Sequence, residues 1–84
     1  MMKIHVRYFA ALREALGASE SVDLPVGSSL RDLREHLRNG GPKHAEVLGP
    51  GRVVRCALNQ VMRDESALLD EGAEVAFFPP VTGG

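Results

Sequence analysis

Hydrophobic and polar residues alternate along residues 3–8 and 20–24 of this chain, and residues 74–78 predict the last strand. A period of two is typical of a β-strand that buries one of its faces. Residues 52–58 are rich in β-branched side chains and predict a further strand. A turn at Asn59 and Gln60 would lead from it into a short strand at 61–62. The pattern therefore predicts a sheet of four to five strands.

A spacing of three and four residues marks the main helix. Leu30, Leu33 and Leu37 would form one apolar stripe along it. Ser28 and Ser29 are both N-cap candidates, and Asp32, three residues after Ser29, would interact well with the helix dipole. These residues predict a helix that covers one face of the sheet.

Two shorter helical segments are expected at 9–16 and 42–48, the first ended by a glycine and the second begun by a proline. A right-handed crossover after the second strand would place the first and last strands side by side. The predicted fold is α+β: a β-grasp (ubiquitin-like) domain over residues 1–80, with a mixed sheet of four to five strands, one main helix and short helical segments.

The chain ends in Phe-Phe-Pro-Pro-Val-Thr-Gly-Gly. Pro79 and Pro80 lack an N–H and would end the sheet pairing, so residues 81–84 are predicted to form an extended tail. Four extended residues reach roughly 13 Å. Such a tail could enter a narrow channel in a partner, where the carboxylate of Gly84 would be sterically open. The alternative is that terminal glycines are simply disordered.

Two aromatic doublets mark a second feature. Neighbours on a strand point to opposite faces, so one member of Phe77–Phe78 should lie away from the helix. For Phe78 we expect a surface that a partner covers. For Phe9, which follows Tyr8, cover by a partner and burial by nearby loops stay equally open.

Composition limits the classes of partner. The chain has 84 residues, a net charge of −1 and one cysteine. This balance favours neither a nucleic-acid nor a membrane partner, and no apolar run approaches the ~20 residues of a membrane span. A single cysteine cannot form an internal disulfide, which favours the reducing cytoplasm.

The sequence holds few groups that could perform chemistry. It has no phosphate-binding glycine loop, and its three histidines have no metal-ligand spacing. Cys56 is expected to be a packed thiol, and Arg34, Glu35 and Arg38 a solvated helix face. Any reaction would therefore centre on the tail, with the catalytic groups supplied by other proteins.

Three segments resemble a known family, the molybdopterin synthase small subunits, or MoaD-type sulfur carriers. They are residues 6–17 (VRYFAALREALG), 57–60 (ALNQ) and 74–84 (EVAFFPPVTGG). The last segment is the most specific of the three. Ala73 departs from the aspartate that is common there in the family, which would change a turn hydrogen bond.

The resemblance implies a route for sulfur. An E1-like activating enzyme of MoeB type would adenylate Gly84 with ATP, and the product would become a thiocarboxylate. The tail would then enter a large subunit of MoaE type, which supplies the acid–base groups, and give sulfur to cyclic pyranopterin monophosphate. The complete enzyme would be a heterotetramer, and this chain would itself bind no cofactor or metal. The residues expected to contact partners are Phe9, Phe78, Pro79, Pro80, Val81, Thr82 and Gly83.

Three other functions remain open at this point. A thiamine-pathway sulfur carrier of ThiS type also ends in Gly-Gly, although the Phe-Phe-Pro-Pro-Val-Thr block speaks against it. A ubiquitin-like modifier would form isopeptide bonds with protein lysines. A β-grasp interaction module would carry an inert tail.

Overall fold

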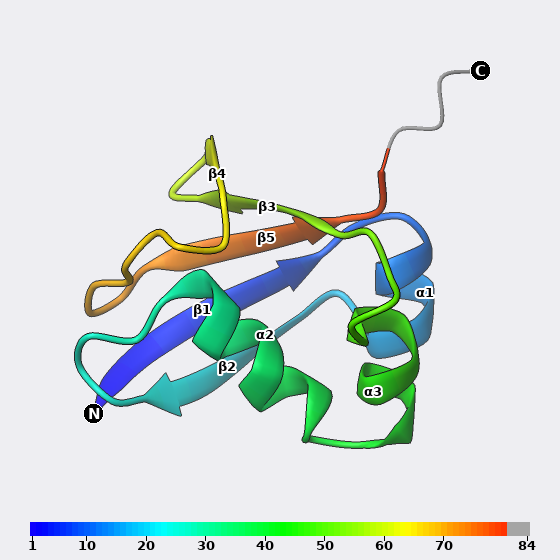
Figure 1. Cartoon of the computed structure of the whole chain (residues 1–84), viewed down its shortest axis with the longest axis horizontal. Coiled ribbons are helices and arrows are strands. Elements are labelled where there is room, and N and C mark those ends of the chain that lie inside the picture. The colour runs from blue at the N-terminus through cyan, green and yellow to red at the C-terminus, as the bar shows by residue number, and fades with distance from the viewer. Residues whose placement is uncertain (81–84) are drawn as a thin grey trace.

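Strand β1 lies inside a five-stranded mixed sheet in the computed structural model, which describes residues 1–80 (Figure 1). The strands are β1 (Met2–Tyr8), β2 (Ser19–Leu24), β3 (Arg55–Leu58), β4 (Val61–Arg63) and β5 (Glu74–Phe78). Their order is β2-β1-β5-β3-β4, with β1 and β5 parallel and the other pairs antiparallel. The first and last strands are therefore neighbours, as predicted. The predicted tail at 81–84 lies outside the described residues.

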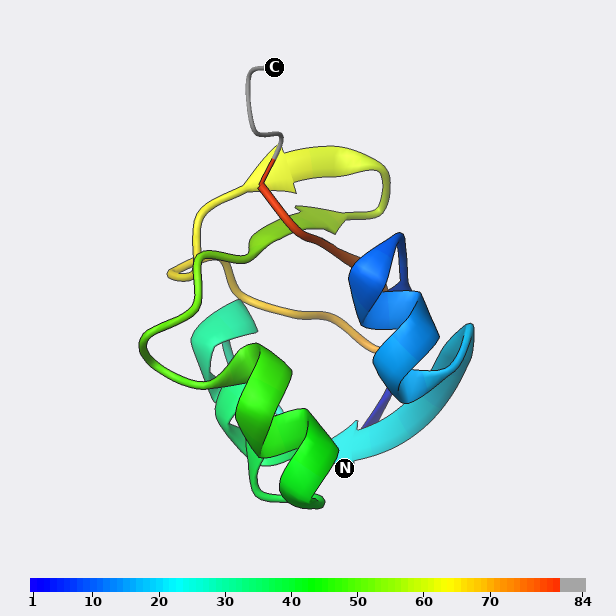
Figure 2. The same ribbon diagram turned by 90° about the vertical axis from the view of Figure 1, so that its right-hand side faces the viewer.

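Within residues 1–80, three helices pack against the core: α1 (Ala11–Leu16), α2 (Leu30–Arg38) and α3 (Pro42–Leu48). The view in Figure 2 shows the sheet curving around the side on which α2 and α3 lie. Each helix contributes a buried leucine to one hydrophobic cluster with the strands. This arrangement of a mixed sheet with one longer helix confirms the predicted β-grasp.

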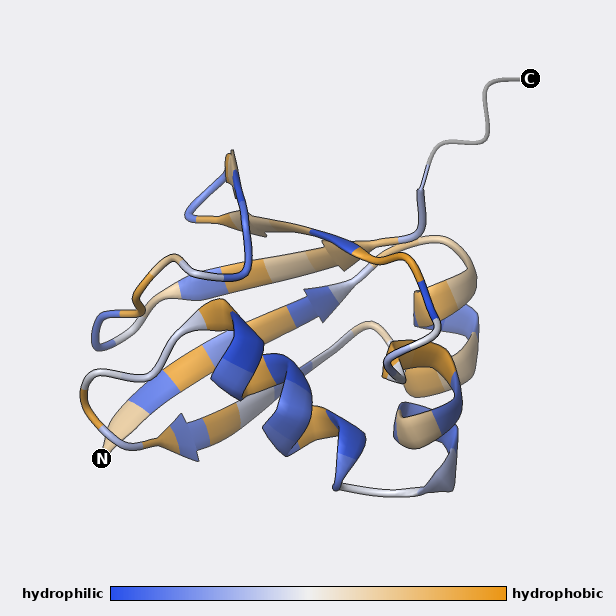
Figure 3. Ribbon diagram, viewed as in Figure 1, coloured by the Kyte–Doolittle hydropathy of each residue, from blue (hydrophilic) through white to orange (hydrophobic). Residues whose placement is uncertain are grey.

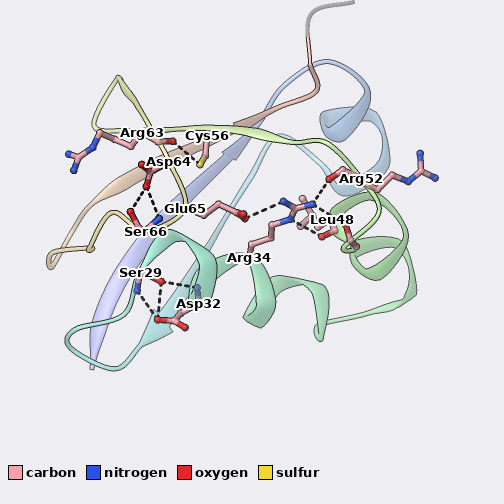
Figure 4. Close-up of polar contacts among 11 residues, drawn as sticks. Ser29, Asp32, Arg34, Leu48, Arg52, Cys56, Arg63, Asp64, Glu65 and Ser66 are labelled. Atoms are coloured by element: carbon pink, nitrogen blue, oxygen red, sulfur yellow. Dashed lines mark hydrogen bonds and ion pairs between the residues drawn. The ribbon is translucent and has the colours of Figure 1, made fainter.

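Helix α2 begins where the sequence indicated. The backbone N–H of Asp32 donates to Ser29 Oγ at 3.2 Å, and the backbone N–H of Ser29 donates to Asp32 Oδ2 at 2.9 Å (Figure 4). This reciprocal capping box satisfies two N–H groups at the first turn. The stripe of Leu30, Leu33 and Leu37 is buried against the sheet.

The alternation in the strands separates the two faces of the sheet. Ile4, Val6 and Tyr8 of β1 and Val75 and Phe77 of β5 are each at most 1% exposed. The residues between them point to the opposite face, and the colours of β1 in Figure 3 alternate accordingly. We call this opposite face, which no helix covers within residues 1–80, the open face.

Arg34 corrects one prediction. Its Nε donates to the carbonyl of Leu48 at 2.8 Å, and its Nη2 donates to the carbonyls of Gly49 at 2.9 Å and Arg52 at 2.7 Å (Figure 4). Its Nη1 pairs with Glu65 at 3.2 Å. The side chain is only 14% exposed, so the expectation that Arg34 is part of a solvated face is wrong. It satisfies carbonyls that the end of α3 leaves without helical partners.

The same contacts explain why β3 is shorter than predicted. The expected strand covered 52–58, whereas β3 begins at Arg55. Arg52 donates its backbone N–H to Gly49 and accepts a hydrogen bond from Arg34, so the chain is still turning there. The predicted strands at 3–8, 20–24 and 61–62 are each one residue longer in the structure, and residues 42–48 form α3 as predicted.

We expect Arg34→Met to lower the free energy of unfolding by about 2 kcal/mol, because three carbonyls lose their donor in a partly buried site. Arg38→Met is the matched control on the same helix. Among residues 1–80, Arg38 pairs with Glu35 alone, at 3.3 Å on the surface, and its loss should cost less than about 0.5 kcal/mol. Urea unfolding measures both variants, and equal losses would contradict this role for Arg34.

A second polar cluster joins α3 to the sheet. Tyr8 Oη donates to Glu20 Oε2 at 2.7 Å, and His44 Nε2 lies 2.8 Å from the same oxygen. Burial alone would raise the pKa of Glu20, but the hydrogen bonds from Tyr8 and His44 outweigh it and hold that pKa below its ordinary value. Burial, with the contact to Glu20, raises the pKa of Tyr8. The Tyr8 hydroxyl therefore stays protonated and acts as a donor.

The lowered pKa of Glu20 predicts a dependence of stability on acid. A carboxyl of this kind stabilises the fold above its unfolded-state pKa, and the contribution is lost as pH falls through its folded-state pKa. We expect Glu20→Gln to flatten the loss of stability below the ordinary pKa of 4.5. Glu46→Gln, an exposed change on α3, should leave the profile unchanged. Thermal unfolding across this pH range tests the expectation, and an identical profile for Glu20→Gln and wild type would refute it.

Candidate functional site: the tail-base groove on the open face

An apolar groove lies on the open face where the chain leaves β5. Its volume is about 630 Å³. We call it the tail-base groove, and its lining residues are Phe9, Ala10, Arg55, Met62, Phe78, Pro79 and Pro80. The two prolines are half-buried, so the segment leading toward the tail forms one wall of the groove.

Two phenylalanines form the floor of the groove. The rings of Phe9 and Phe78 stack at 5.0 Å between centroids, with 18° between their planes. Parallel pairing of β1 with β5 sets Tyr8 beside Phe77, and the backbone N–H of Phe9 donates to Phe77 at 3.2 Å. Because each next residue points to the other face, Tyr8 and Phe77 enter the core while Phe9 and Phe78 meet outside it.

The structure thus confirms that one member of Phe77–Phe78 lies away from the helices. It also decides the location of Phe9, which lies half-buried on the open face against Phe78. That Phe9, Phe78, Pro79 and Pro80 contact a partner stays a prediction. The other expected site residues, Val81, Thr82, Gly83 and Gly84, lie outside the described residues.

The turn at Ala10 directs Phe9 into the groove. Ala10 has φ 55° and ψ −131°, a backbone conformation that residues other than glycine rarely adopt. The predicted helix at 9–16 therefore begins only at Ala11. Backbone strain of this kind costs about 1–3 kcal/mol and is common at functional sites.

We expect Ala10→Gly to raise the free energy of unfolding by about 1 kcal/mol, because glycine adopts this conformation without the clash of a Cβ. Ala11→Gly, one residue later in α1, is the matched control and should lower it by about 1 kcal/mol. Urea denaturation measures both variants. A loss of stability in Ala10→Gly equal to that in Ala11→Gly would contradict the strain.

The open face continues beside the groove into a smaller depression of about 260 Å³. Asn59 and Gln60 turn between β3 and β4 with φ values of 49° and 71°, which confirms the predicted turn. Asn59 exchanges hydrogen bonds with the backbone of Glu74, at 2.8 and 2.9 Å, and so fixes this hairpin to β5. Gln60 borders the depression next to Met62.

Three of the groove residues were not singled out in the sequence: Ala10, Arg55 and Met62. The period-two pattern of β3 could have indicated Arg55, which lies directly across from Phe78. The predicted turn at Asn59 and Gln60 places Met62 close to the preceding strand, but only the pairing of Ala57 with Met62 shows that it lies at the groove. Nothing about an alanine at position 10 indicates the unusual backbone conformation that it adopts.

The described residues offer little catalytic chemistry of their own. No group of three or more His, Cys, Asp or Glu side chains within residues 1–80 could hold a metal ion. Cys56 is 4% exposed, as expected of a packed thiol, and burial raises its pKa. Among the helices of residues 1–80, none is both long and apolar enough to cross a membrane.

Comparison with known proteins places the chain in a family. The ThiS family profile matches residues 6–84. The chain belongs to the ThiS family. It is 37% identical to the molybdopterin synthase sulfur carrier subunit of Haemophilus influenzae, over 96% of this chain and 99% of that protein. It is 35% identical to small archaeal modifier protein 3 of Haloferax volcanii, over 99% of this chain and 100% of that protein.

Solved structures agree with this family and with the fold. A putative molybdopterin-converting factor subunit 1 from Pyrococcus furiosus has a TM-score of 0.78 and 32% identity, covering 96% of this chain and 100% of that one. A chain in the protein–protein complex of subunits 1 and 2 of the Helicobacter pylori molybdopterin-converting factor has a TM-score of 0.71 and 27% identity, covering 99% and 100%.

Proposed function

We propose that this chain is the sulfur carrier and small subunit of a molybdopterin synthase, and that Gly84 carries the sulfur. The observation that carries this proposal is the similarity to the Haemophilus influenzae carrier subunit over nearly the full length of both chains. The family profile alone does not separate thiamine-pathway carriers from molybdopterin ones, but two further curated relatives of 35–36% identity are also molybdopterin synthase sulfur carrier subunits.

The proposed chemistry begins with activation. The Gly84 carboxylate attacks the α-phosphate of ATP on an E1-like enzyme of MoeB type, pyrophosphate leaves, and an acyl-adenylate forms. A sulfide-level sulfur nucleophile supplied by a separate donor then displaces AMP and leaves a thiocarboxylate. ATP belongs to the activating partner in this scheme, and this chain binds no cofactor. These steps would occur in the cytoplasm, where ATP is available.

Sulfur transfer follows in the large subunit. The thiocarboxylate sulfur forms a bond to a side-chain carbon of cyclic pyranopterin monophosphate while a C–O bond at that carbon breaks, and the departing oxygen takes a proton from an acid group of the large subunit. Water then cleaves the acyl–sulfur bond, so the substrate keeps the sulfur and Gly84 regains its carboxylate. A second loaded carrier supplies the other sulfur of the dithiolene. The large subunit, of MoaE type, supplies the acid–base groups, in a heterotetramer of two small and two large subunits.

The tail-base groove is consistent with a carrier that docks on a catalytic large subunit. Its apolar floor of Phe9 and Phe78 offers a partner a surface next to the point where the chain leaves β5. The Helicobacter pylori complex of subunits 1 and 2 supports a large-subunit partner for this fold. Pro79 and Pro80 limit the conformations that must be frozen when the tail enters a channel, which lowers the entropic cost of binding. Val81, Thr82 and Gly83 would lie in that channel.

Reconstitution tests the proposal. The full chain is co-purified with the large subunit from the same organism, loaded by the activating enzyme, ATP and a sulfur donor, and assayed for molybdopterin. We expect a stable complex that converts cyclic pyranopterin monophosphate to molybdopterin only after loading. Loaded chain that yields thiamine-pathway thiazole but no molybdopterin would reject this function in favour of the thiamine route.

A protein modifier is the second candidate function. The similarity to small archaeal modifier protein 3 over 99% of this chain favours it. A modifier would use the same activated Gly84, but a protein lysine rather than a sulfur donor would displace AMP. Conjugates of increasing mass with protein lysines would support it.

A further inference from the structure

Two arginines on the open face have no carboxylate partner within residues 1–80. Arg7 is exposed on β1, and its guanidinium carbon lies 5.4 Å from the ring centroid of Phe9. Arg55 is exposed on β3, directly across from Phe78, and lines the tail-base groove. By contrast, Arg34 on α2 forms an ion pair with Glu65 at 3.2 Å. Arg7 and Arg55 have no comparable ion pair within residues 1–80.

The charge of the open face is uneven along β5. Glu74 is the acidic residue that borders this part of the face, and it lies at the start of the strand. Phe78 lies at its end, about 13 Å away at the rise of a strand. Arg55 lies across from Phe78, and Arg7 lies across from Ala76, between Phe78 and Glu74. The two arginines therefore flank β5 on the half of the face toward Phe78, and Glu74 borders the same depression as Arg7.

A partner that covers the groove would also remove the charged side chains of Arg7 and Arg55 from water. Removing an arginine from water without a partner is costly, and a carboxylate can satisfy the guanidinium through two parallel hydrogen bonds. A second copy of this chain fits poorly, because a two-fold contact through the groove would bring the arginines of both copies together. The partner surface must therefore supply negative charge.

We propose that Arg7 and Arg55 pair with carboxylates on the docking surface of the large subunit, at the mouth of the channel that receives the tail. This inference rests on the proposed function. The apolar floor supplies the buried contact, and the two arginines on either side of β5 fix the orientation in which the tail points into the channel. Such charges also speed association, and salt weakens their effect.

The test uses the full chain and the purified large subunit from the same organism. The double variant Arg7→Glu with Arg55→Glu reverses both charges on the open face. The double variant Arg31→Glu with Lys43→Glu is the control, because it makes the same change in net charge at exposed positions on α2 and α3. Calorimetric titration at about 0.05 M and about 0.5 M NaCl gives Kd under weak and strong screening.

We expect the Arg7 and Arg55 variant to bind about 30-fold more weakly at low salt, with a smaller difference at high salt. The control variant should stay within about threefold of wild type, and circular dichroism should show both variants folded. Changing the facing carboxylates of the large subunit to arginine should restore binding of the reversed variant.

Binding of the reversed variant with the wild-type Kd and salt dependence would overturn the pairing while leaving the proposed function intact. An equal loss in the control would also overturn it, because the effect would then come from net charge alone. A wild-type chain that dimerises through the groove in sedimentation would show that the occupant is a second copy. Failure of the wild-type chain to bind the large subunit at all would reject the proposed function together with the pairing.

Discussion

Deletion of Gly84 should abolish sulfur transfer and leave thermal unfolding almost unchanged. The terminal carboxylate of the proposed mechanism moves to Gly83 in this variant, so it falls short of its position in each partner by one residue, about 3.3 Å. The buried side chains of the described core all belong to residues 1–80, and glycine has no side chain to add to them, so we expect the deletion to leave the core intact. The measurements are molybdopterin formation after loading and the midpoint of thermal unfolding.

Gly51→Ala is the control for this deletion. Gly51 lies in open space, with no atom within 4 Å of the position of an added Cβ, so the variant should keep full activity and stability. Sulfur transfer by the deletion variant at the wild-type rate would remove Gly84 from the mechanism. A fall of many degrees in its unfolding midpoint would show instead that the terminus supports the fold.

The second large effect separates two adjacent residues. Phe77 is 1% exposed in the core, and Phe77→Ala should lower the free energy of unfolding by about 3–5 kcal/mol. Phe78 stacks on Phe9 outside that core, so Phe78→Ala should weaken binding to the large subunit by about 2 kcal/mol. Its cost in stability should be much smaller than that of Phe77→Ala. Urea unfolding and calorimetric titration measure the two quantities.

This pair tests the alternation of β5 directly. If both variants lost stability equally and kept their affinity for the large subunit, the tail-base groove would contribute to folding and not to binding. An unchanged dissociation constant for Phe78→Ala would by itself remove Phe78 from the interface.

The features that the sequence predicted correctly depend on short-range patterns. Ser29 was one of two adjacent N-cap candidates, and Asp32 lies three residues after it, although the reciprocal capping box itself was not predicted. The opposite orientations of Phe77 and Phe78 follow from the period of a strand. The prediction of the fold also used the general rule that the crossover after the second strand is right-handed. The location of Phe78 on the open face followed from the same local pattern.

The features that the sequence did not predict depend on contacts between distant segments. Arg34 reaches carbonyls 14–18 residues away, and nothing in its helical neighbourhood indicates them. Arg7 and Arg55 lie on either side of β5 on the open face only because β5 pairs with both β1 and β3. Ala10 has an ordinary side chain in a conformation typical of glycine, so its role is visible only in the backbone.

The most direct test of sulfur loading is the intact mass of the chain after incubation with the activating enzyme, ATP and a sulfur donor. We predict the exchange of one oxygen for sulfur, located by fragmentation in the C-terminal peptide that ends at Gly84. A ladder of lysine conjugates without that exchange, or an unchanged mass with active enzyme, would contradict the account.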